Sequence, residues 1–556
     1  MQKKQTILVV ASLLVVVLSV TLAYFTAQII GKGKNVTINS ADLKIIFTDS
    51  DGSISGSNIE PGKWDVTKTF TIENKSNETY KYNIVIQDLV NTFVTEGYLQ
   101  YKITSTNGGY NMTEFKDVPK SETATDKILA YSVSIPVGVT QSYTVQFIYK
   151  NDEEVDQSED MGKKLSGKLF ITEGTKEPVT LLSQILNDNP TRSTRSSNNN
   201  GTNDFATPLT TTTTGTLFTS TESIAGGTPK EVYYYAGNTT NNWLKFGTFA
   251  SDGPIRGYYS TTSTSLYKEY TTLDECNSAS SYNTNCSYAW RKGDQMYWRI
   301  IRTNHDGSIR LLYSGTNPDT TEGHLGESTF NTSYNSPKYV GYKYGEDTSL
   351  DTIRNNTTDS TIKTYVDNWY KNNLTNYTKY LSTSAVYCND RSLGTGQTYS
   401  ASSSSKFNFA TYYRMDDDTK GAKANPTYNC IDIRDAFSVD NTSAKLTYPV
   451  SLMTADEIAF AGGVAKKNMN RPYAWFISNS VGTQVSAYWW SLSPFSWDGS
   501  HAFVWRWDSV YADNLSVRVG DPIAVRPVIS LKSCTLYSTG DGTPETPYEI
   551  STTSGC

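Results

Sequence analysis

Histidine is scarce in this sequence, which has three histidines among 556 residues. Imidazole is the side chain that most often serves acid–base catalysis near neutral pH, and it is a common metal ligand, so the chain has little material for either. No long run of lysine and arginine occurs, and the formal net charge at pH 7 is -6. Nucleic-acid-binding surfaces need such basic clusters. We therefore expect no metal, no cofactor and no nucleic-acid partner.

Motifs of the common enzyme classes are absent as well. The chain has no G-x-S-x-G nucleophile elbow, no H-E-x-x-H metal site and no glycine-rich phosphate loop between a strand and a helix. We expect no catalytic residues, so the sequence does not predict an enzyme. A carboxylate pair for glycoside hydrolysis stays open at this point, because any two acidic side chains can meet in a folded chain.

Cysteine is missing from the first 275 residues, and the later part of the chain holds Cys276, Cys286, Cys388, Cys430, Cys534 and Cys556. None of them forms a C-x-x-C pair, which argues against zinc and thioredoxin-like sites. An even number of cysteines without metal-ligand spacing favours disulfides, which form in an oxidising compartment. We expect nearest neighbours to pair: Cys276 with Cys286, Cys388 with Cys430, and Cys534 with Cys556.

A hydrophobic segment at the N-terminus predicts export. Two lysines precede an uncharged run from Thr6 to Gly31, which is long enough to cross a bilayer as a helix. Residues 1–30 therefore read as a signal peptide or as a signal-anchor helix. Cleavage after Ala23 fits the small residues that a signal peptidase prefers. Either way we expect an extracellular or cell-surface protein, with the membrane as a partner only if the helix is uncleaved.

Residues 35–175 carry the pattern of an all-β domain. Seven short segments mix β-branched, aromatic and polar residues: VTINSADLKIIFTD, KTFTIENKS, YKYNIVIQDL, LQYKITS, YSVSIP, SYTVQFIY and KLSGKLFIT. Turn-forming pairs such as Asp51-Gly52 and Pro61-Gly62 separate them. Short strands at this spacing predict an antiparallel β-sandwich. The junction LAYFTA followed by FTIENKSNETYKYNIVI resembles camelysin- and TasA-type secreted β-sandwich proteins, which implies a structural fibre or matrix subunit as an alternative function.

Residues 176–231 are predicted to be a linker or stalk. LLSQILNDNP, from Leu181 to Pro190, predicts a short amphipathic helix that ends at proline. The chain then becomes rich in serine, asparagine and threonine up to about Gly227. A segment of this composition buries too little apolar surface to fold by itself.

Residues 232–556 are richer in tyrosine, tryptophan and cysteine, and they predict an α+β domain. Strands are expected at EVYYYAG, NWLKFGTF, MYWRIIRT, SIRLLYSG, HAFVWRW and AVRPVISL. STIKTYVDNWYKNNL predicts a helix with Ile362, Val366 and Trp369 on one face. LMTADEIAFAGG predicts a second helix, because Thr454 precedes Glu457 by three residues, as in a capping box, and glycines follow the segment.

Six phrases in this region occur together in a fixed order. They are YYYAGNTTNNWLKFG, MYWRIIRTNHDGSIRLLY, YPVSLMTADEIAFAGG, YWWSLSP, AVRPVISLKSC and STGDGTPETPYEI. This set resembles a bacterial surface domain of gut Firmicutes and their wall-less relatives. Its W-x-x-S-P and V-R-P parts are similar to the C-type-lectin-like fold of diversity-generating-retroelement variable proteins and of formylglycine-generating enzymes. The resemblance implies a C-type-lectin-like domain over residues 232–556.

The loops around residues 495–523, which follow the framework strand YWWSLSP, are the expected binding region. In the lectin-like variable proteins, the recognition residues precede the V-R-P strand, which places the loops here at 495–523. Strand alternation puts Trp505 and Trp507 on one face, and exposed aromatic rings beside charges are typical of binding hot spots. We expect ligand contacts from Trp497, Asp498, His501, Trp505, Trp507, Tyr511 and Arg518.

Two further residues of this region are predicted to be structural. Trp489 is expected in the core, and its neighbour Trp490 points to the opposite face of the strand, so the two rings are not expected to enter the same core. Arg526 interrupts the apolar strand AVRPVISL. An outward position on an edge strand is one interpretation, but the resemblance favours a buried arginine held by carboxylates or carbonyls.

Two motifs with possible chemistry receive a simpler interpretation. His305-Asp306-Gly307 follows a predicted strand and predicts a hairpin turn, because Asp-Gly suits a positive φ and no second histidine accompanies it. The three aspartates at 416–418 lack the spacing of a calcium loop, so a solvated loop is favoured.

The sequence therefore predicts an exported cell-surface or secreted binding protein. Its lectin-like head would recognise an extracellular protein or glycan, as a receptor or adhesin, including the diversified type that retroelements target. The alternatives are the TasA-type structural subunit and an enzyme on the fold of formylglycine-generating enzymes.

Overall fold

The structure is a computed structural model that describes residues 35–40, 43–49, 53–55, 59–75, 79–174, 178–195, 205, 214–260, 263–318, 323–415, 425–463, 475–476, 488–508 and 513–551. The chain divides into an N-terminal unit, residues 1–178, and a C-terminal unit, residues 179–556. The expected signal or anchor helix at 1–30 lies outside the described residues. Within the described ranges, no helix combines the length and the apolar character that crossing a bilayer requires.

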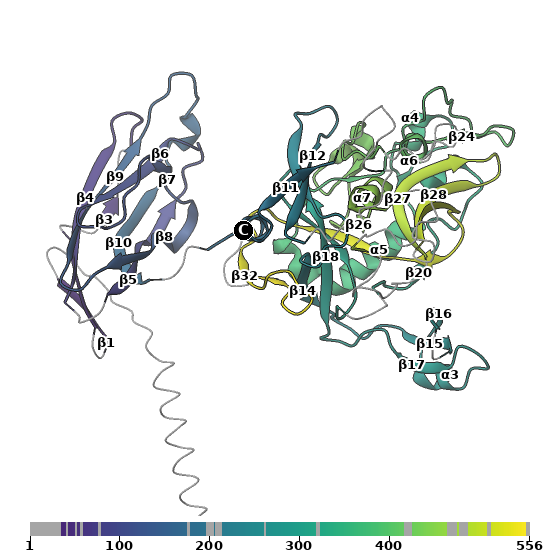
Figure 1. The fold of residues 1–556 in the computed structure, drawn as a ribbon. Coiled ribbons are helices and arrows are strands. Elements are labelled where there is room, and N and C mark those ends of the chain that lie inside the picture. The colour runs from purple at the N-terminus through teal and green to yellow at the C-terminus, as the bar shows by residue number, and fades with distance from the viewer. Residues whose placement is uncertain are drawn as a thin grey trace, which may run out of the picture. The chain divides into compact units, whose positions relative to one another are not determined.

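The N-terminal unit contains two antiparallel sheets. Their strands are β1 (Asn35–Ser40), β2 (Leu43–Asp49), β3 (Ser53–Ser55), β4 (Asp65–Asn74), β5 (Tyr80–Asn91), β6 (Leu99–Ser105), β7 (Lys116–Asp117), β8 (Ser121–Ile135), β9 (Thr140–Tyr149) and β10 (Leu165–Glu173). One sheet has the order β1-β2-β4-β9-β6-β7 and the other β3-β10-β5-β8 (Figure 1). All seven predicted strand segments form strands.

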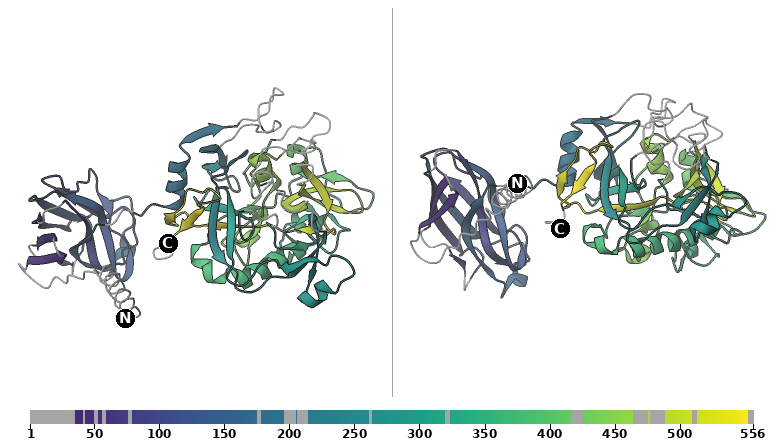
Figure 2. Two further views of the ribbon diagram at one scale, coloured as in Figure 1. Left: turned by 60° about the horizontal axis from the view of Figure 1, so that its bottom comes forward. Right: turned by 90° about the horizontal axis from the view of Figure 1, so that it is seen from below.

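The two sheets pack over one hydrophobic core (Figure 2). Ile72 of β4 and Val145 of β9 come from the larger sheet, while Ile84 of β5 and Ile171 of β10 come from the smaller one, and all four belong to the same buried cluster. In β9 the buried residues alternate with exposed ones, as period-2 side chains of a half-buried strand must. The N-terminal unit is therefore a β-sandwich, as the sequence predicted.

The start of the C-terminal unit differs from the predicted linker at 176–231. Helix α2 (Leu181–Asp188) forms as expected and buries Leu181 and Ile185. Strands β11 (Thr191–Thr194) and β12 (Thr216–Glu222) follow it and join the main sheet of the unit. Leu217 and Phe218 of β12 are buried. A strand that pairs with a stable sheet needs few apolar side chains of its own. The sequence predicted α2, but it did not predict β11 and β12.

The main sheet of the C-terminal unit has ten strands in mixed orientation. Besides β11 and β12 it contains β13 (Lys230–Tyr234), β14 (Trp243–Thr248), β18 (Gln295–Thr303), β19 (Ile309–Tyr313), β26 (Ser451–Leu452), β31 (Pro527–Leu531), β32 (Tyr537–Thr539) and β33 (Tyr548–Ile550). Strand β33, near the C-terminus, lies beside β14 in parallel. The sheet therefore joins segments that are about three hundred residues apart in the chain.

A second sheet of the unit carries the tryptophan-rich segment. Its strands are β20 (Glu327–Ser328), β24 (Phe407–Asn408), β27 (Tyr488–Trp497), β28 (Ala502–Asp508), β29 (Asp513–Arg518) and β30 (Ile523–Ala524). Two-stranded pairs link β21 (Lys343–Tyr344) to β22 (Thr358–Asp359) and β23 (Tyr387–Cys388) to β25 (Ala436–Phe437). The short helices α4 (Leu350–Ile353) and α6 (Ala410–Met415) lie in the connections. Strands and helices mix in this unit, so the α+β class is confirmed at that coarse level.

Both helices predicted for this region are present. Helix α5 (Thr361–Asn373) buries Ile362, Val366 and Trp369, as the i, i+4, i+7 spacing indicated. Helix α7 (Ala455–Ala461) begins with the capping box between Thr454 and Glu457 and ends at Gly462, whose φ is 115°. A left-handed residue at this position satisfies the last helix carbonyls, and glycine adopts it without strain.

A small three-stranded module projects from the rest of the C-terminal unit (Figures 1 and 2). It consists of β15 (Ile255–Ser260), β16 (Ser263–Tyr270), α3 (Leu273–Asn277) and β17 (Thr284–Tyr288). The disulfide Cys276–Cys286 closes it. At its base the buried Arg256 donates hydrogen bonds to Glu269 Oε1 at 3.2 Å and to the carbonyl of Leu325 at 2.8 Å.

Two of the three predicted disulfides are confirmed, Cys276–Cys286 and Cys388–Cys430. Cys534 is also disulfide-bonded, and its predicted partner Cys556 lies outside the described residues. Disulfides persist where the surroundings are oxidising. The pairs therefore indicate an oxidising, extracellular environment.

Candidate functional site

The structure buries the tryptophans that were expected to face a ligand. Trp505 and Trp507 are 0% exposed and Trp497 is 2% exposed. Trp505 packs against Phe495 at a ring-centroid distance of 4.7 Å, and Trp507 packs against Phe476 at 4.7 Å. The expected exposure of these three rings is wrong, because other segments cover the strand face that carries them.

Trp489 is buried as predicted, but Trp490 enters the same hydrophobic cluster, against the expectation that one strand cannot send both rings there. Trp490 packs against Phe330 at 5.5 Å and donates its indole N–H to the carbonyl of Ser328 at 2.7 Å. Trp489 lies on the other side of β27, against Phe476 at 6.0 Å. Strand β27 is covered on both faces, so alternation does not separate core from surface here.

The remaining predicted contact residues lie on the surface near the end of β27. Asp498 accepts hydrogen bonds from the backbone N–H groups of Ser500 and His501, both at 2.7 Å. The imidazole of His501 stacks on the ring of Tyr334 at 5.2 Å. Arg518 is exposed and pairs with Asp521 at 3.2 Å. We call Tyr334, Asp498, His501 and Arg518 the loop patch; Tyr511 lies outside the described residues.

Arg526 is buried, and carbonyls hold it, as predicted. Its guanidinium donates to the carbonyl of Tyr313 at 3.1 and 3.2 Å and to the hydroxyl of Ser314 at 3.0 Å. It also lies over the ring of Trp489 at 5.2 Å. Burial lowers the pKa of Arg526 to about 9, so the side chain still carries its charge at pH 7. The residue ties β31 to β19 and takes no part in a surface site.

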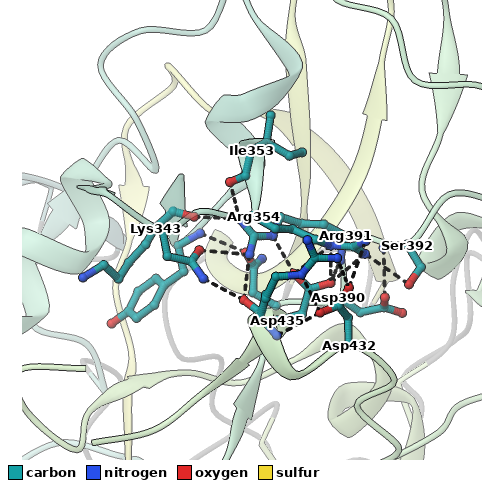
Figure 3. Close-up of polar contacts among 12 residues, drawn as sticks. Lys343, Ile353, Arg354, Asp390, Arg391, Ser392, Asp432 and Asp435 are labelled. Atoms are coloured by element: carbon teal, nitrogen blue, oxygen red, sulfur yellow. Dashed lines mark hydrogen bonds and ion pairs between the residues drawn. The ribbon is translucent and has the colours of Figure 1, made fainter. Parts of the chain in front are cut away.

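A network of arginines and carboxylates holds the loops of the C-terminal unit (Figure 3). Asp435 is buried and accepts hydrogen bonds from Arg391 Nε at 2.7 Å and from Arg354 Nη2 at 2.8 Å. Arg391 Nη1 donates to the carbonyls of Lys343 and Ile353, and its Nη2 donates to two further oxygens. All five donors of Arg391 are thus used. This network is structural, since none of the Arg391 donors remains for a ligand.

A second group of buried charges surrounds a very small cavity. Arg302 bridges Glu222 at 2.9 Å and Glu457 at 2.8 Å, and Arg310 also contacts Glu457. Burial raises the pKa of Glu222, but the nearby cations lower it by a larger amount, so the resulting pKa is about 2. The adjoining cavity has a volume of about 20 Å³, which is room for one water molecule. These charges stabilise one another and leave no space for a substrate.

His305-Asp306-Gly307 is the predicted turn, because Gly307 has a φ of 76°. Asp306 accepts hydrogen bonds from the hydroxyls of Ser382 and Ser384 at 2.7 Å each. Within the described residues, no group of three or more His, Cys, Asp and Glu side chains is arranged to hold a metal ion. The aspartates at 416–418 lie outside the described residues.

A row of side chains crosses three neighbouring strands of the main sheet. Lys245 of β14 lies opposite Tyr297 of β18 and opposite Glu549 of β33. Its Nζ is 3.0 Å from Glu549 Oε1 and 5.9 Å from the centre of the Tyr297 ring. Residues paired across strands share one face of a sheet. The three side chains therefore form a polar and aromatic row on the surface of the sheet.

A β-bulge shapes the sheet beside this row. The pairing of β14 with β18 shifts between Lys245 and Thr248, and Gly247 adopts a φ of 76°. Gln295 Nε2 donates to the carbonyl of Gly247 at 2.8 Å and to that of Met296 at 3.1 Å. Glycine tolerates this φ, and bulges of this kind bend a strand. The bulge lies between the Lys245–Tyr297 pair and the Thr248–Gln295 pair.

The 3-10 helix η3 (Thr375–Tyr380) forms the other wall. The Tyr377 hydroxyl accepts a hydrogen bond from the Thr248 N–H at 3.1 Å. The rings of Tyr377 and Tyr380 pack edge-on against Phe246 at 5.3 and 5.9 Å. The space between η3 and the sheet has a volume of about 360 Å³ and is lined by Lys245, Phe246, Gly247, Gln295, Tyr297, Tyr377, Tyr380, Glu549 and Ile550. We call it the tyrosine groove.

The tyrosine groove has the size and lining of a ligand site. Pockets for small ligands occupy roughly 300–1,000 Å³ and combine aromatic side chains with a few polar groups. Sequence reasoning missed this site. Three of the quoted phrases contain its strand residues other than Gln295, in WLKFG, MYWR and PYEI, but nothing in the sequence showed that they meet.

Comparisons with known proteins do not assign the chain. No family model matches it, and no curated protein matches it. A solved structure described as "AvmM Catalyzes Macrocyclization in Alchivemycin A Biosynthesis" matches 27% of this chain and 100% of its own, at 11% identity and a TM-score of 0.14. A likeness at that score carries no argument about fold or function.

Proposed function

We propose that this chain is an exported binding protein whose C-terminal unit holds its ligand in the tyrosine groove. The observation that carries the proposal is the groove itself. It places aromatic rings and hydrogen-bonding groups around a volume of about 360 Å³ on a rigid sheet. By contrast, the charged cavity at Arg302 has a volume of about 20 Å³.

The proposal keeps two expectations from the sequence. The hydrophobic segment at 1–30 directs export, and it serves either as a cleaved signal or as an anchor. The C-terminal unit adopts a C-type-lectin-like arrangement, as the resemblance over residues 232–556 implies. The disulfides support the first expectation, because they fit an oxidising extracellular environment.

The binding site differs from the one that the sequence favoured. The tryptophans of the 495–523 loops are buried, so those loops offer only the loop patch to a ligand. The groove instead draws on β14, β18, β33 and η3, which are held by a main-chain hydrogen-bonding network. Sites on rigid elements keep their geometry in the free protein and lose less entropy on binding.

The experiment compares groove variants with loop-patch variants in the purified protein. The probes are immobilised panels of oligosaccharides and of short peptides. We expect saturable binding of at least one probe, lost in Tyr297→Ala and retained in Tyr334→Ala and His501→Ala. Loss in the loop-patch variants with retention in Tyr297→Ala would move the site to the loops and refute the proposal. The absence of binding to both panels would also refute it.

The alternative of a TasA-type fibre subunit stays a prediction from the N-terminal unit. It requires the protein to assemble through its β-sandwich. Light scattering across a concentration series of the purified protein checks it, and a protein that stays monomeric throughout contradicts it.

A further inference from the structure

From the chemistry of its lining we infer that the tyrosine groove binds a neutral saccharide. This inference rests on the proposed function and adds the class of ligand. It depends on three properties of the groove: its charge balance, its accessible ring face and its mixture of hydrogen-bond donors and acceptors.

The charges of the groove cancel. Lys245 and Glu549 are the charged residues in the lining, and they pair with each other at 3.0 Å. The two side chains are 30% and 42% exposed, so the pair lies in contact with solvent at the groove. Sites for phosphate and carboxylate ligands use arginine pairs or helix N-termini, and the lining has neither. A neutral ligand suits this charge balance better than an anionic one.

Tyr297 supplies the ring face. Tyr377 and Tyr380 are engaged with Phe246 through edge-on contacts, so their rings form the wall. Tyr297 stands on the sheet at one end of the row, half-buried, with Lys245 Nζ 5.9 Å from the centre of its ring. The face of an aromatic ring carries partial negative charge, and the C–H groups on one side of a sugar ring carry partial positive charge. Stacking of a sugar on Tyr297 therefore buries apolar surface and gains a favourable electrostatic contact.

The polar groups beside Tyr297 match hydroxyl groups, which both donate and accept hydrogen bonds. Gln295 uses Nε2 for two backbone carbonyls, which leaves Oε1 as its acceptor. Glu549 uses Oε1 for Lys245, which leaves a second carboxylate oxygen. Lys245 and the Tyr297 hydroxyl supply donors. The groove thus offers both donors and acceptors beside the ring, as a polyol requires.

Two other classes of neutral ligand fit less well. A lipid chain gains affinity only by burying apolar surface, and the Lys245–Glu549 pair and Gln295 would lose hydration against it without new partners. A proline-rich peptide docks on aromatic grooves, but its backbone offers carbonyl acceptors and no matching N–H at proline. Such a peptide would leave Glu549 and the acceptor of Gln295 without donors.

The test measures the affinity of the purified protein for three sets of soluble probes by isothermal titration calorimetry. The sets are neutral oligosaccharides of glucose, galactose, mannose and N-acetylglucosamine, sialylated oligosaccharides, and a proline-rich peptide. We expect saturable binding within the neutral set alone. Tyr297→Ala and Glu549→Gln should each weaken this binding at least tenfold.

The control is Tyr259→Ala, because Tyr259 is 62% exposed on the projecting module and belongs to the same unit without lining the groove. It should bind like the unaltered protein. Near-ultraviolet circular dichroism of each variant shows that the fold is retained. Tyr297→Phe keeps the stacking surface and removes the hydroxyl, so it separates the contribution of the ring to binding from that of the hydroxyl.

The possible failures are distinguishable. Binding of the peptide or of sialylated probes in preference to neutral ones, with loss in Tyr297→Ala, refutes the saccharide inference and leaves the proposed function intact. Binding of neutral saccharides that is insensitive to both groove substitutions refutes the groove as the site. No binding within any set refutes both.

Discussion

Trp505 is the sharpest test of whether the tryptophan-rich segment is core. Its ring is 0% exposed and packs in a cluster with Met415, Ala455 and Ala459, next to Phe495. Replacing a fully buried large side chain with alanine costs the lost burial and leaves a cavity, which together amount to about 3–5 kcal/mol. Whole domains are stable by roughly 5–15 kcal/mol. Trp505→Ala should therefore remove a large part of the stability of the C-terminal unit.

A second substitution makes the prediction more specific. In the described residues, the indole Nε1 of Trp505 is buried without a hydrogen-bond partner, whereas that of Trp298 donates to the Phe246 carbonyl at 2.8 Å. Both rings are 0% exposed. Trp505→Phe loses no hydrogen bond, but Trp298→Phe strands a buried carbonyl. Trp298→Phe should cost about 1–3 kcal/mol more than Trp505→Phe.

Urea unfolding followed by tryptophan fluorescence measures these differences. Ten of the eleven tryptophans follow Val179, so the signal reports mainly on the C-terminal unit. Tyr334→Ala serves as the control, since Tyr334 is 46% exposed. If Trp505→Ala unfolds within about 0.5 kcal/mol of the unaltered protein, which is typical of surface substitutions, the ring is not core and the reasoning fails.

The remaining predictions concern buried charges and one disulfide. The pKa of Glu222 is depressed, from an ordinary 4.5 to about 2 in the folded chain. The ionised side chain therefore contributes about 3 kcal/mol to the free energy of unfolding above pH 4.5, and this contribution is lost as the pH falls through 2. In an acid-unfolding series, the free energy of unfolding of Glu222→Gln should fall less steeply with pH, and an unchanged slope contradicts the ion-pair assignment. Arg391→Met removes part of the positive charge that compensates the buried Asp435 and should lower the free energy of unfolding by about 3–5 kcal/mol. Urea unfolding measures this difference, and no change would show that the network is solvated. Replacing Cys276 and Cys286 with serine opens a loop of sequence separation 10 and should destabilise the projecting module by up to about 3 kcal/mol. Limited proteolysis should then cut within residues 255–288 first, and cleavage elsewhere would show that the disulfide does not hold the module.

Local structure followed from the sequence where one chemical pattern decided it. Strand β9 has one face on the core and one in solvent, so the alternation of its residues with a period of two was sufficient to predict the strand. Both ends of helix α7 could be predicted from the sequence, because Thr454 marks its start and Gly462 marks its end. The nearest-neighbour disulfides at Cys276 and Cys388 followed from short separations, which make the loops that they close easy to form.

The predictions that failed concerned residues whose burial depends on what covers a strand. Alternation gives Trp505 and Trp507 a common face, but the segment around α7 that packs on that face is set by tertiary structure. The same applies to β12, whose Leu217 and Phe218 find an existing sheet edge. In each case a few apolar side chains gained their burial from partners distant in the sequence.

The tyrosine groove could not have been predicted from the sequence for a related reason. Lys245 and Glu549 are 304 positions apart, and η3 reaches them through Tyr377 from a third segment. Their meeting depends on the parallel pairing of β14 with β33 and on the bulge at Gly247. No local pattern encodes that pairing.

The central claim is that ligand binds between η3 and the main sheet, and hydrogen exchange followed by mass spectrometry tests it most directly. The unaltered protein is compared with and without a saturating concentration of the oligosaccharide that binds most tightly. We predict slower exchange in peptides that cover 375–380 and 548–551, with no change in those that cover 498–508 and 513–518. Protection confined to 498–518, with 375–380 unchanged, would contradict the account.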